Sequence, residues 1–454
     1  MNVTDKRDLT SGPTWKKLIQ LAGPMVFGIV AVISVSLVDT YYVGRLGTQE
    51  LTALSFTFPV TLIVSSLAIG LGAGASSVVS RAVGADERDD AKRLATDSLA
   101  LAFFLVIAVA AVGYFAIDPL FAVLGATGEI LDLVGRYMRI WFLAIPLLVV
   151  PIVANSIVRA TGDSFWPSVV MVTSALTNIA ITPVFIFGWG PVPAFGIEGA
   201  AIGTLVAWLV TVFGAFALVA YRERMLTMAM PGLATLAHSW KRILGIGIPA
   251  SFGNAVNPMG IAVATSIIAA FGGVVVAGFG VATRIESLAV IPMLALSSAI
   301  GPFTGQNWGA GKCDRVSEAL KFCYAVCAVW AFVLAVFFWF AAEPIVRIFS
   351  QEDKVVRAAT TYLAIVPISL WGYGIVIITA GAFNALGLSH YGLGLYLVRT
   401  AVLYVPFAFT ASRLAGSEAV FYGIAAANAL AGIVVAGFAL NWLSRHDAPA
   451  TATA

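Results

Sequence analysis

The sequence predicts an all-α polytopic membrane protein with twelve transmembrane helices in two pseudo-symmetric six-helix bundles. Its composition is the first observation: 60% of the 454 residues are hydrophobic and 11% are charged, whereas an ordinary soluble domain has about 25% charged residues. The second is that uncharged runs long enough to cross a bilayer recur along the whole chain. The third is that landmarks of the first half return in the second half at a fixed spacing.

The apolar runs have the length that membrane helices need. About 30 Å of hydrocarbon, crossed at 1.5 Å per residue, requires roughly 20 apolar residues, and Ser98–Ile117 and Phe322–Ala342 are two such uncharged runs. A membrane barrel would instead alternate polar and apolar residues over short strands. The expected spans are Leu18–Tyr41, Leu54–Val79, Leu94–Ile117, Leu133–Val158, Phe165–Trp189, Gly196–Tyr221, Ile243–Ala270, Val274–Phe303, Ala319–Ala342, Ala358–Leu386, Leu393–Ala411 and Ala419–Leu443.

The positions of Lys and Arg predict the orientation of these spans. The larger share of the 26 basic residues lies in the two tails and the even-numbered loops, and cytoplasmic loops carry such an excess. We therefore expect a multi-pass protein of the inner (plasma) membrane with both termini in the cytoplasm. The polar N-terminus contains no pattern of a cleaved signal peptide. The expected parts are a tail at 1–17, an N-lobe at 18–222, a linker at 223–242, a C-lobe at 243–443 and a tail at 444–454.

An internal repeat is the most informative feature of the chain. One constant shift, close to half the chain length, superimposes Pro24 on Pro249, Gly28 on Gly253, Gly47 on Gly272, Tyr137 on Tyr362 and Gly162 on Gly387. Because each half has six spans, both halves enter the membrane from the same side and form parallel repeats. Transporters built from such repeats bind substrate between the halves and move one half against the other. The duplication indicates a carrier, since neither a channel nor an enzyme requires it.

One acidic residue lies within the first span. A charge at the centre of the membrane costs about 2.5–3.5 kcal/mol on insertion scales. An acid such as Asp39 within a span therefore suggests a functional role. The repeat places Ala264 at the corresponding position of the second half. Burial favours the protonated form of a carboxyl group, so Asp39 could carry a proton or exchange it for sodium. The alternative is an acid near the outer helix end that only meets water.

Other polar residues could share a site with this acid. Asn178 and Thr182 are four residues apart and therefore share a helix face, and Pro183 frees a backbone carbonyl one turn earlier. Asn155 on the fourth span and Thr204 on the sixth could complete an oxygen-rich site of the kind that hard cations such as sodium prefer. Each could instead form only a hydrogen bond between helices.

The eighth span carries a second pair of charges, Arg284 and Glu286. Two residues apart, they do not face each other on a helix. A structural role with other helices and a substrate contact in the C-lobe both remain open. No phosphate-binding loop, metal-ligand cluster or nucleophile–base pair is present, so we expect no enzyme activity, no cofactor and no resident metal. Nothing in the pattern favours nucleic-acid binding.

These residues together resemble a known family, the multidrug and toxic compound extrusion (MATE) transporters, and its DinF-like branch in particular. The motifs are Val38-Asp39-Thr-Tyr-Tyr-Val-Gly44-Arg-Leu-Gly47, Ser80-Arg81-x-x-Gly84-Ala85, Arg159-Ala-x-Gly162-Asp163, Asn178 to Gly188, Gly199-Ala-Ala-x-Gly-Thr204 and Val281-Ala-Thr-Arg284-Ile-Glu286. The resemblance covers nearly the whole chain. It implies two six-helix lobes, a central cavity and drug efflux driven by a proton or sodium gradient.

The resemblance also implies roles for single residues. Asp39 is similar to the family's cation-binding acid of the N-lobe, and its polar neighbours are matched by Asn155, Asn178 and Thr204. Tyr137 and Pro24 resemble residues of the cavity and of the helix bend. Many relatives have an aspartate where Thr182 stands, which favours protons over sodium here. The seventh-helix acid of other branches is absent, because Val256 and Asn257 occupy that region.

The predicted function is therefore secondary antiport. We expect a monomer that exports amphipathic, cationic drugs or toxic metabolites in exchange for protons or sodium, by rocking of two lobes. Asp39, with Asn178, Thr182, Thr204 and Asn155, would bind the coupling ion, and a sodium ion would be held at Asp39 and Asn178. Tyr137, Pro24, Arg284 and Glu286 would line the substrate cavity. The alternatives are a flippase for a lipid-linked precursor, a membrane-embedded enzyme and a passive channel.

Overall fold

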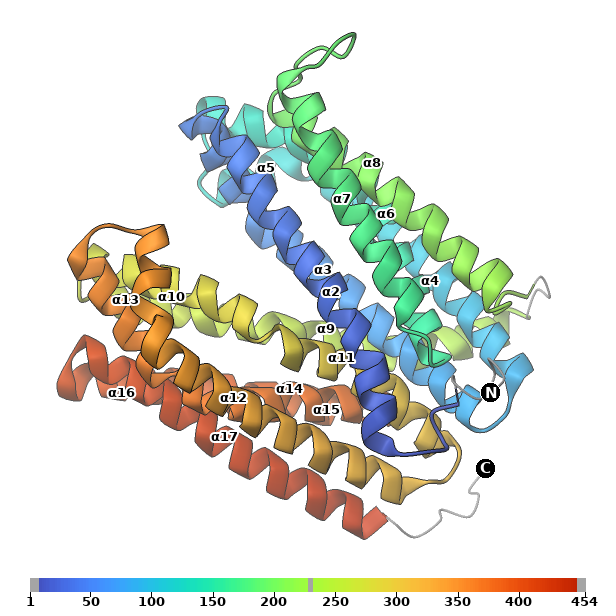
Figure 1. Cartoon of the computed structure of the whole chain (residues 1–454). Helices are drawn as coiled ribbons and strands as arrows, with labels where there is room; N and C mark the ends of the chain where they lie inside the picture. Colours follow the sequence, from blue (N-terminus) through green and yellow to red (C-terminus); the bar gives the residue numbers. More distant parts are fainter. Residues whose placement is uncertain (1–7, 228–231, 447–454) are drawn as a thin grey trace. The chain divides into compact units, whose positions relative to one another are not determined.

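The computed structural model describes residues 8–227 and 232–446, and these residues are almost entirely helical (Figure 1). The helices of the first half are α2 (Thr14–Gly44), α3 (Thr48–Gly84), α4 (Arg88–Phe115), α5 (Ile117–Val123), α6 (Gly128–Ala160), α7 (Phe165–Phe187), α8 (Ile197–Ala217) and η1 (Leu218–Arg222). Those of the second half are α9 (Leu233–Ala269), α10 (Gly273–Ala289), α11 (Ile291–Gly309), α12 (Cys313–Phe349), α13 (Asp353–Ile365), η2 (Pro367–Ser369), α14 (Leu370–Ala385), α15 (Ser389–Leu397), η3 (Val398–Tyr404), α16 (Val405–Ala415) and α17 (Ser417–His446).

The lengths and hydropathy of these helices confirm a twelve-span membrane protein. Among the described residues, eleven helical stretches are long and apolar enough to cross a membrane, and α10 with α11 makes a twelfth span that is bent by 45°. The bent pair corresponds to the span expected at Val274–Phe303. Pro292 lies in the first turn of α11, where the missing N–H of proline is best tolerated and the preceding helix ends.

The helix boundaries repeat with the spacing that the sequence predicted. α2 ends at residue 44 and α9 at 269, while α3 covers 48–84 and the pair α10–α11 covers 273–309. In the same way α6 covers 128–160, and the run from α13 to α14 covers 353–385. All of these boundaries are related by the same shift that superimposes Pro24 on Pro249. The duplication therefore extends from single landmarks to whole helices.

The second half breaks helices that are continuous in the first. α6 runs without interruption, whereas its counterpart is divided by the short helix η2, which begins at Pro367. A proline cannot donate the backbone hydrogen bond that would continue the preceding helix, and its ring crowds the previous turn. Proline alone does not decide the outcome, because α6 passes through Pro146 and Pro151.

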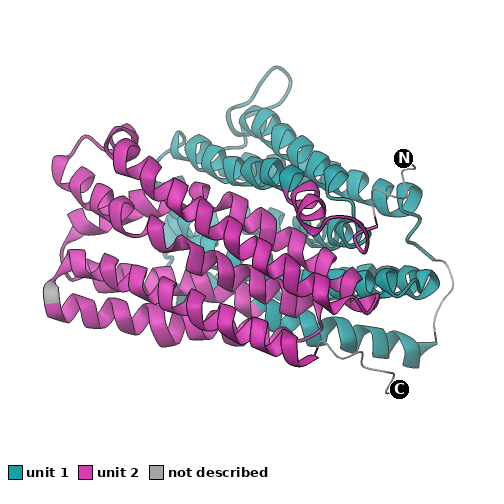
Figure 2. Ribbon diagram, turned by 60° about the horizontal axis from the view of Figure 1, so that its bottom comes forward, with its two compact units in different colours: residues 1–7, 23–251 teal, residues 8–22, 252–454 magenta. Residues whose placement is uncertain are grey.

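The chain divides into two compact units, shown in different colours in Figure 2. The described part of the first unit is 23–251, and that of the second is 8–22 with 252–446. The chain therefore passes from one unit to the other inside α2 and inside α9. α2 begins at Thr14 and α9 at Leu233, so helix extends into the expected tail at 1–17 and the expected linker at 223–242, and these assignments stay predictions. Their residues 1–7, 228–231 and 447–454 lie outside the described part.

Candidate functional site in the first bundle

Asp39 lies on α2 between two side-chain contacts that this helix makes with α7. The two helices touch on the N-terminal side of Asp39, where the Ser168 hydroxyl donates to the Met25 sulfur at 3.5 Å. They touch again one turn beyond it, where the Tyr42 hydroxyl donates to the Ile179 carbonyl at 3.4 Å. Asp39 is partly buried, and its Oδ1 atom is fully buried without a hydrogen-bond partner among the described residues.

The neighbouring helices α7 and α8 contribute the polar residues predicted from the sequence. The Asn178 amide donates to the Thr204 hydroxyl at 3.4 Å, and that hydroxyl donates to the Ala200 carbonyl at 3.0 Å. Thr182, one turn after Asn178, is completely buried against Gly203. A Cβ at Gly203 would lie 2.4 Å from the Thr182 hydroxyl oxygen, so this close approach of α7 and α8 requires glycine.

Three buried oxygen atoms of this region have no hydrogen-bond partner in the part of the chain that the structure describes: Asp39 Oδ1, Asn178 Oδ1 and Thr182 Oγ1. Each unsatisfied buried polar group costs about 1–3 kcal/mol, and native structures keep few of them without a reason. Oxygen atoms of this kind are what a proton, a hydrated proton or a sodium ion would satisfy. We call Asp39, Asn178, Thr182 and Thr204 the N-lobe polar site.

Tyr137 adjoins this site, whereas Asn155 does not fit it. Tyr137 is buried on α6, close enough to Asp39 for the carboxylate charge to act on its hydroxyl. Asn155 is on the same helix about five turns, roughly 27 Å, further along. The two residues therefore cannot both contact Asp39. The Oδ1 atom of Asn155 is also buried without a partner among the described residues, but this geometry does not support its predicted part in coupling.

Pro24 lies inside α2, which remains one helix from Thr14 to Gly44. It directly follows the point between Ala22 and Gly23 where the helix passes from the second unit to the first. A Cβ at Gly23 would meet no atom within 4 Å. The position is suited to bending, and the bending role of Pro24 stays a prediction.

The predicted charges of the second bundle have different environments. Arg284 is exposed, and within the described residues its side chain has no ion pair or hydrogen bond. Glu286 is partly buried and accepts a hydrogen bond of 2.5 Å from the Tyr362 hydroxyl. Both residues lie on α10, but no described residue bonds to both of them. The predicted role of both in a substrate cavity remains untested.

Sequence reasoning did not identify the partners of Arg399 in the second bundle. Its guanidinium is buried and donates to the side-chain oxygens of Asn428 and Asn257, at 2.9 and 2.7 Å. The Asn residues lie on α17 and α9, far from Arg399 in the sequence, and no spacing pattern connects them. Tyr362, the partner of Glu286, could have been found from the sequence, because the repeat aligns it with Tyr137.

Two duplicated helix bundles with an unsatisfied acidic site inside one of them define a membrane carrier, and the comparisons with known proteins identify its family. The MatE family model matches residues 24–184 and 249–410, so the chain belongs to the MATE family of membrane transporters. The members of this family are transporters and not enzymes. The assignment to the DinF-like branch stays a prediction.

Relatives and solved structures cover the chain almost completely. An FAD transporter of Shewanella oneidensis is 37% identical, over 94% of this chain and 95% of its own length. The multidrug export protein MepA of Staphylococcus aureus is 24% identical, over 92% of each chain. Among solved structures, the Vibrio cholerae MATE transporter VcmN in its bent form has a TM-score of 0.89 at 27% identity, covering 96% of this chain and 98% of its own. A MOP superfamily transporter from Pyrococcus furiosus has a TM-score of 0.88 at 26% identity, covering 98% and 99%.

Proposed function

We propose that this MATE transporter is a secondary antiporter in which Asp39 binds the coupling cation. The main supporting observation is that buried oxygen atoms of Asp39 on α2, and of Asn178 and Thr182 on α7, have no partner among the described residues. A structural hydrogen-bond network would satisfy these atoms internally. An ion site leaves them free for the ion.

The proposed cycle uses the difference between a charged and a neutral carboxyl group. An ion arriving from outside neutralises Asp39, which favours the state that releases substrate outside. Loss of the ion to the cytoplasm restores the charge, and the two bundles move relative to each other between these states. One elementary charge crossing the membrane supplies about 2.3 kcal/mol per 100 mV, so one ion per cycle supports modest accumulation.

We favour a proton as the coupling ion. Hard cations take several oxygen ligands, and their binding tightens with the number of charged ligands. The N-lobe polar site includes one carboxylate, that of Asp39, and Thr182 and Asn178 contribute only neutral oxygens. A sodium ion held at Asp39 and Asn178 remains the competing proposal.

For the substrate we propose an amphipathic organic molecule, with two candidates. The first is a cationic drug or toxic metabolite, supported by the multidrug export protein MepA among the relatives. The second is a flavin dinucleotide, supported by the higher identity to the FAD transporter of Shewanella oneidensis. A lipid-linked precursor has less support, because such a flippase needs an accessible basic cavity. In the second bundle Arg399 is buried and bound to asparagines, whereas Arg284 is exposed.

The proposed setting is the inner membrane, with both termini in the cytoplasm and the protein acting as a monomer. The distribution of Lys and Arg supports this orientation.

The test is uptake by liposomes that contain the purified protein and an outward gradient of either protons or sodium. Ethidium and FAD serve as separate probes outside. We expect one of them to accumulate when protons flow outward, and not when sodium alone does. The matched control is Glu129→Gln, which removes an exposed acid at the start of α6 and should leave uptake unchanged. Absence of accumulation under both gradients would contradict the proposal.

A further inference from the structure

Glu286 is a partly buried acid with one strong, short contact. Its Oε2 atom accepts a hydrogen bond of 2.5 Å from the Tyr362 hydroxyl, which lies in the range of charge-assisted O–H···O⁻ bonds. Tyr362 is only 2% exposed, and its ring packs edge-on against Phe279 and Phe421, with centroids 5.5 and 5.2 Å away. The tyrosine is therefore fixed, and it holds the carboxyl group of a residue that is itself only partly buried.

The positive charge that balances Glu286 is held separately. Arg399 is 5% exposed, donates to Asn428 and Asn257, and lies over the rings of Tyr373 and Tyr404 at 4.5 and 5.3 Å. All these partners are neutral. Within the described residues Arg399 makes no ion pair with Glu286, although the two charges interact through space.

The charged and titratable groups around Glu286 come from three elements. Tyr362 reaches it from α13, Tyr373 from α14, and Arg399 and Tyr404 from η3. Arg284 on its own helix shares no contact with it among the described residues. In the part of the chain that the structure describes, the surroundings thus contain one fixed positive charge, three hydroxyl groups and no second carboxylate.

The repeat gives this arrangement a counterpart in the first bundle. Tyr137 and Tyr362 occupy equivalent positions of the repeat and lie in the same repeated segment. Each lies beside an acid from a different helix, Asp39 on α2 and Glu286 on α10. The two bundles therefore share a tyrosine-and-acid pair, although the acids themselves are not repeat-related.

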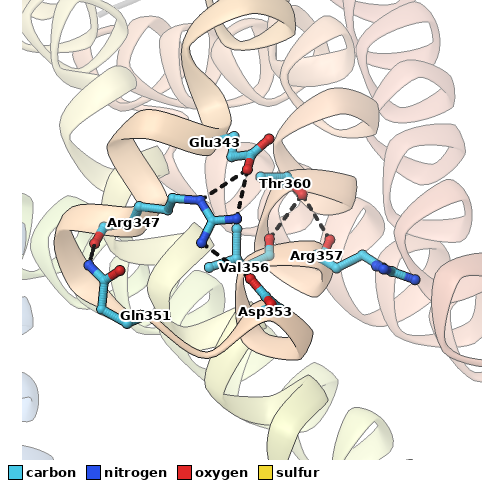
Figure 3. Close-up of polar contacts among 7 residues, drawn as sticks. All are labelled: Glu343, Arg347, Gln351, Asp353, Val356, Arg357 and Thr360. Atoms are coloured by element: carbon cyan, nitrogen blue, oxygen red, sulfur yellow. Dashed lines mark hydrogen bonds and ion pairs between the residues drawn. The ribbon is translucent and has the colours of Figure 1, made fainter.

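A cavity lies beside Tyr362. It has a volume of about 430 Å³ and is lined by Ala358, Thr361 and Phe421 together with the charged residues Asp353, Lys354, Arg357 and Glu418. Thr361 precedes Tyr362, and Phe421 packs directly on the Tyr362 ring. Figure 3 shows Asp353 and Arg357 at this end of α13, where Arg347 bonds Glu343 and Asp353.

We propose that Glu286 is a second proton-binding site, used in each transport cycle in addition to Asp39. This inference rests on the proposed ion-coupled function. A water-borne proton forms an O–H bond with the Glu286 carboxylate, Tyr362 keeps its own proton, and the bundle gains one positive charge. That charge is Arg399 without its counter-charge, and an uncompensated buried charge is strongly unfavourable. Protonation therefore favours rearrangement of η3. A nearby guanidinium also disfavours sodium, so the ligand is the proton.

The test is infrared difference spectroscopy of the purified protein in lipid nanodiscs between low and high pH, which detects protonated carboxyl groups without any transport. We expect the membrane-buried carboxyl signal to contain two components. Glu286→Gln should remove one component, and Asp39→Asn should remove the other. Glu343→Gln, at an exposed acid of the same bundle, is the matched control and should leave both components in place.

An unchanged spectrum in Glu286→Gln would overturn the proposal, because Glu286 would then keep one protonation state as a structural counter-charge to Arg399. Should Glu286→Gln fail to fold, Tyr362→Phe gives the same decision. It retains the acid but removes its hydrogen bond, and should move one carboxyl component to higher frequency. If no carboxyl component changes frequency in Tyr362→Phe, the proposed proton site is contradicted. If Asp39→Asn removes no component while Glu286→Gln does, the proposed function is contradicted, but the proton site at Glu286 is supported.

Discussion

The central residue is Asp39, whose Oδ1 atom is buried in the first bundle without a hydrogen-bond partner among the described residues. Its neighbours Asn178 and Thr182 present oxygens in the same unsatisfied condition. These groups were predictable from the sequence, because an acid in an apolar span needs a reason and two polar residues four apart share a helix face. Their buried and unpaired state could only be seen in the structure.

Asn155 shows what residue types alone cannot decide. Its type and its place on an inner helix favoured the same site, but position along α6 decides the matter. Tyr137 interacts with Asp39, and Asn155 is roughly 27 Å away from Tyr137 along the helix. The sequence pattern does not indicate how deep Asp39 lies relative to α6, so the choice between the two residues required coordinates.

A first prediction concerns the glycine that lets α7 and α8 approach. Gly203→Ala places a Cβ 2.4 Å from the Thr182 hydroxyl oxygen and 2.7 Å from its Cα. Overpacking of this kind typically costs about 1–3 kcal/mol, so we expect a lower unfolding temperature in detergent, followed by tryptophan fluorescence. Gly437→Ala is the control, because a Cβ there meets nothing within 4 Å. Equal unfolding temperatures for the two variants would refute the tight contact.

At the scale of elements, α2 belongs to both units. The segment before it, with Leu9 almost completely buried, is held on the second unit: Leu9 donates to Gln306, and Asn307 and Arg315 donate to the Leu9 carbonyl. From the sequence these residues are expected to be part of a polar tail, because short irregular segments have no periodicity. Their docking depends on side chains from α11 and α12 that only the fold brings together.

The docking predicts a measurable effect of Arg315→Ala. This substitution removes hydrogen bonds to the carbonyls of Leu9 and Gly12, at 3.2 and 2.9 Å. Hydrogen bonds from a charged group are worth about 1.5–3 kcal/mol, so amide hydrogen exchange in residues 9–12 should accelerate by about tenfold or more. Lys321→Ala, at an exposed position of the same helix, is the control. Unchanged exchange in Arg315→Ala would mean that the segment is held by other contacts.

At the scale of the whole molecule, the duplication accounts for the architecture and for its predictability. Twelve apolar runs and one constant shift between the halves were visible in the sequence, and the helix boundaries follow them closely. What the pattern did not predict was the bend between α10 and α11, the break at η2 or the division of the chain inside α2 and α9. Prolines lie at the bend and at the break, but α6 passes through two prolines without interruption, so proline positions alone do not predict these features.

The orientation in the membrane is the prediction that belongs to this scale. In a background with Cys313, Cys323 and Cys327 replaced by alanine, we expect Glu87→Cys to react with membrane-impermeant maleimide only from the cytoplasmic side. Gln351→Cys, between α12 and α13, should react only from the opposite side. Both positions are exposed. The reversed pattern would show that the excess of Lys and Arg does not set the topology.

The most direct measurement of the central claim compares two kinds of transport in Asp39→Asn. Gradient-driven accumulation and gradient-free exchange of the same labelled substrate are measured in liposomes containing this variant. A neutral side chain of similar size leaves the fold and the substrate path in place but cannot alternate between charge states. The account predicts that exchange continues while accumulation against a gradient is lost. Accumulation at the rate of the unaltered protein would contradict it.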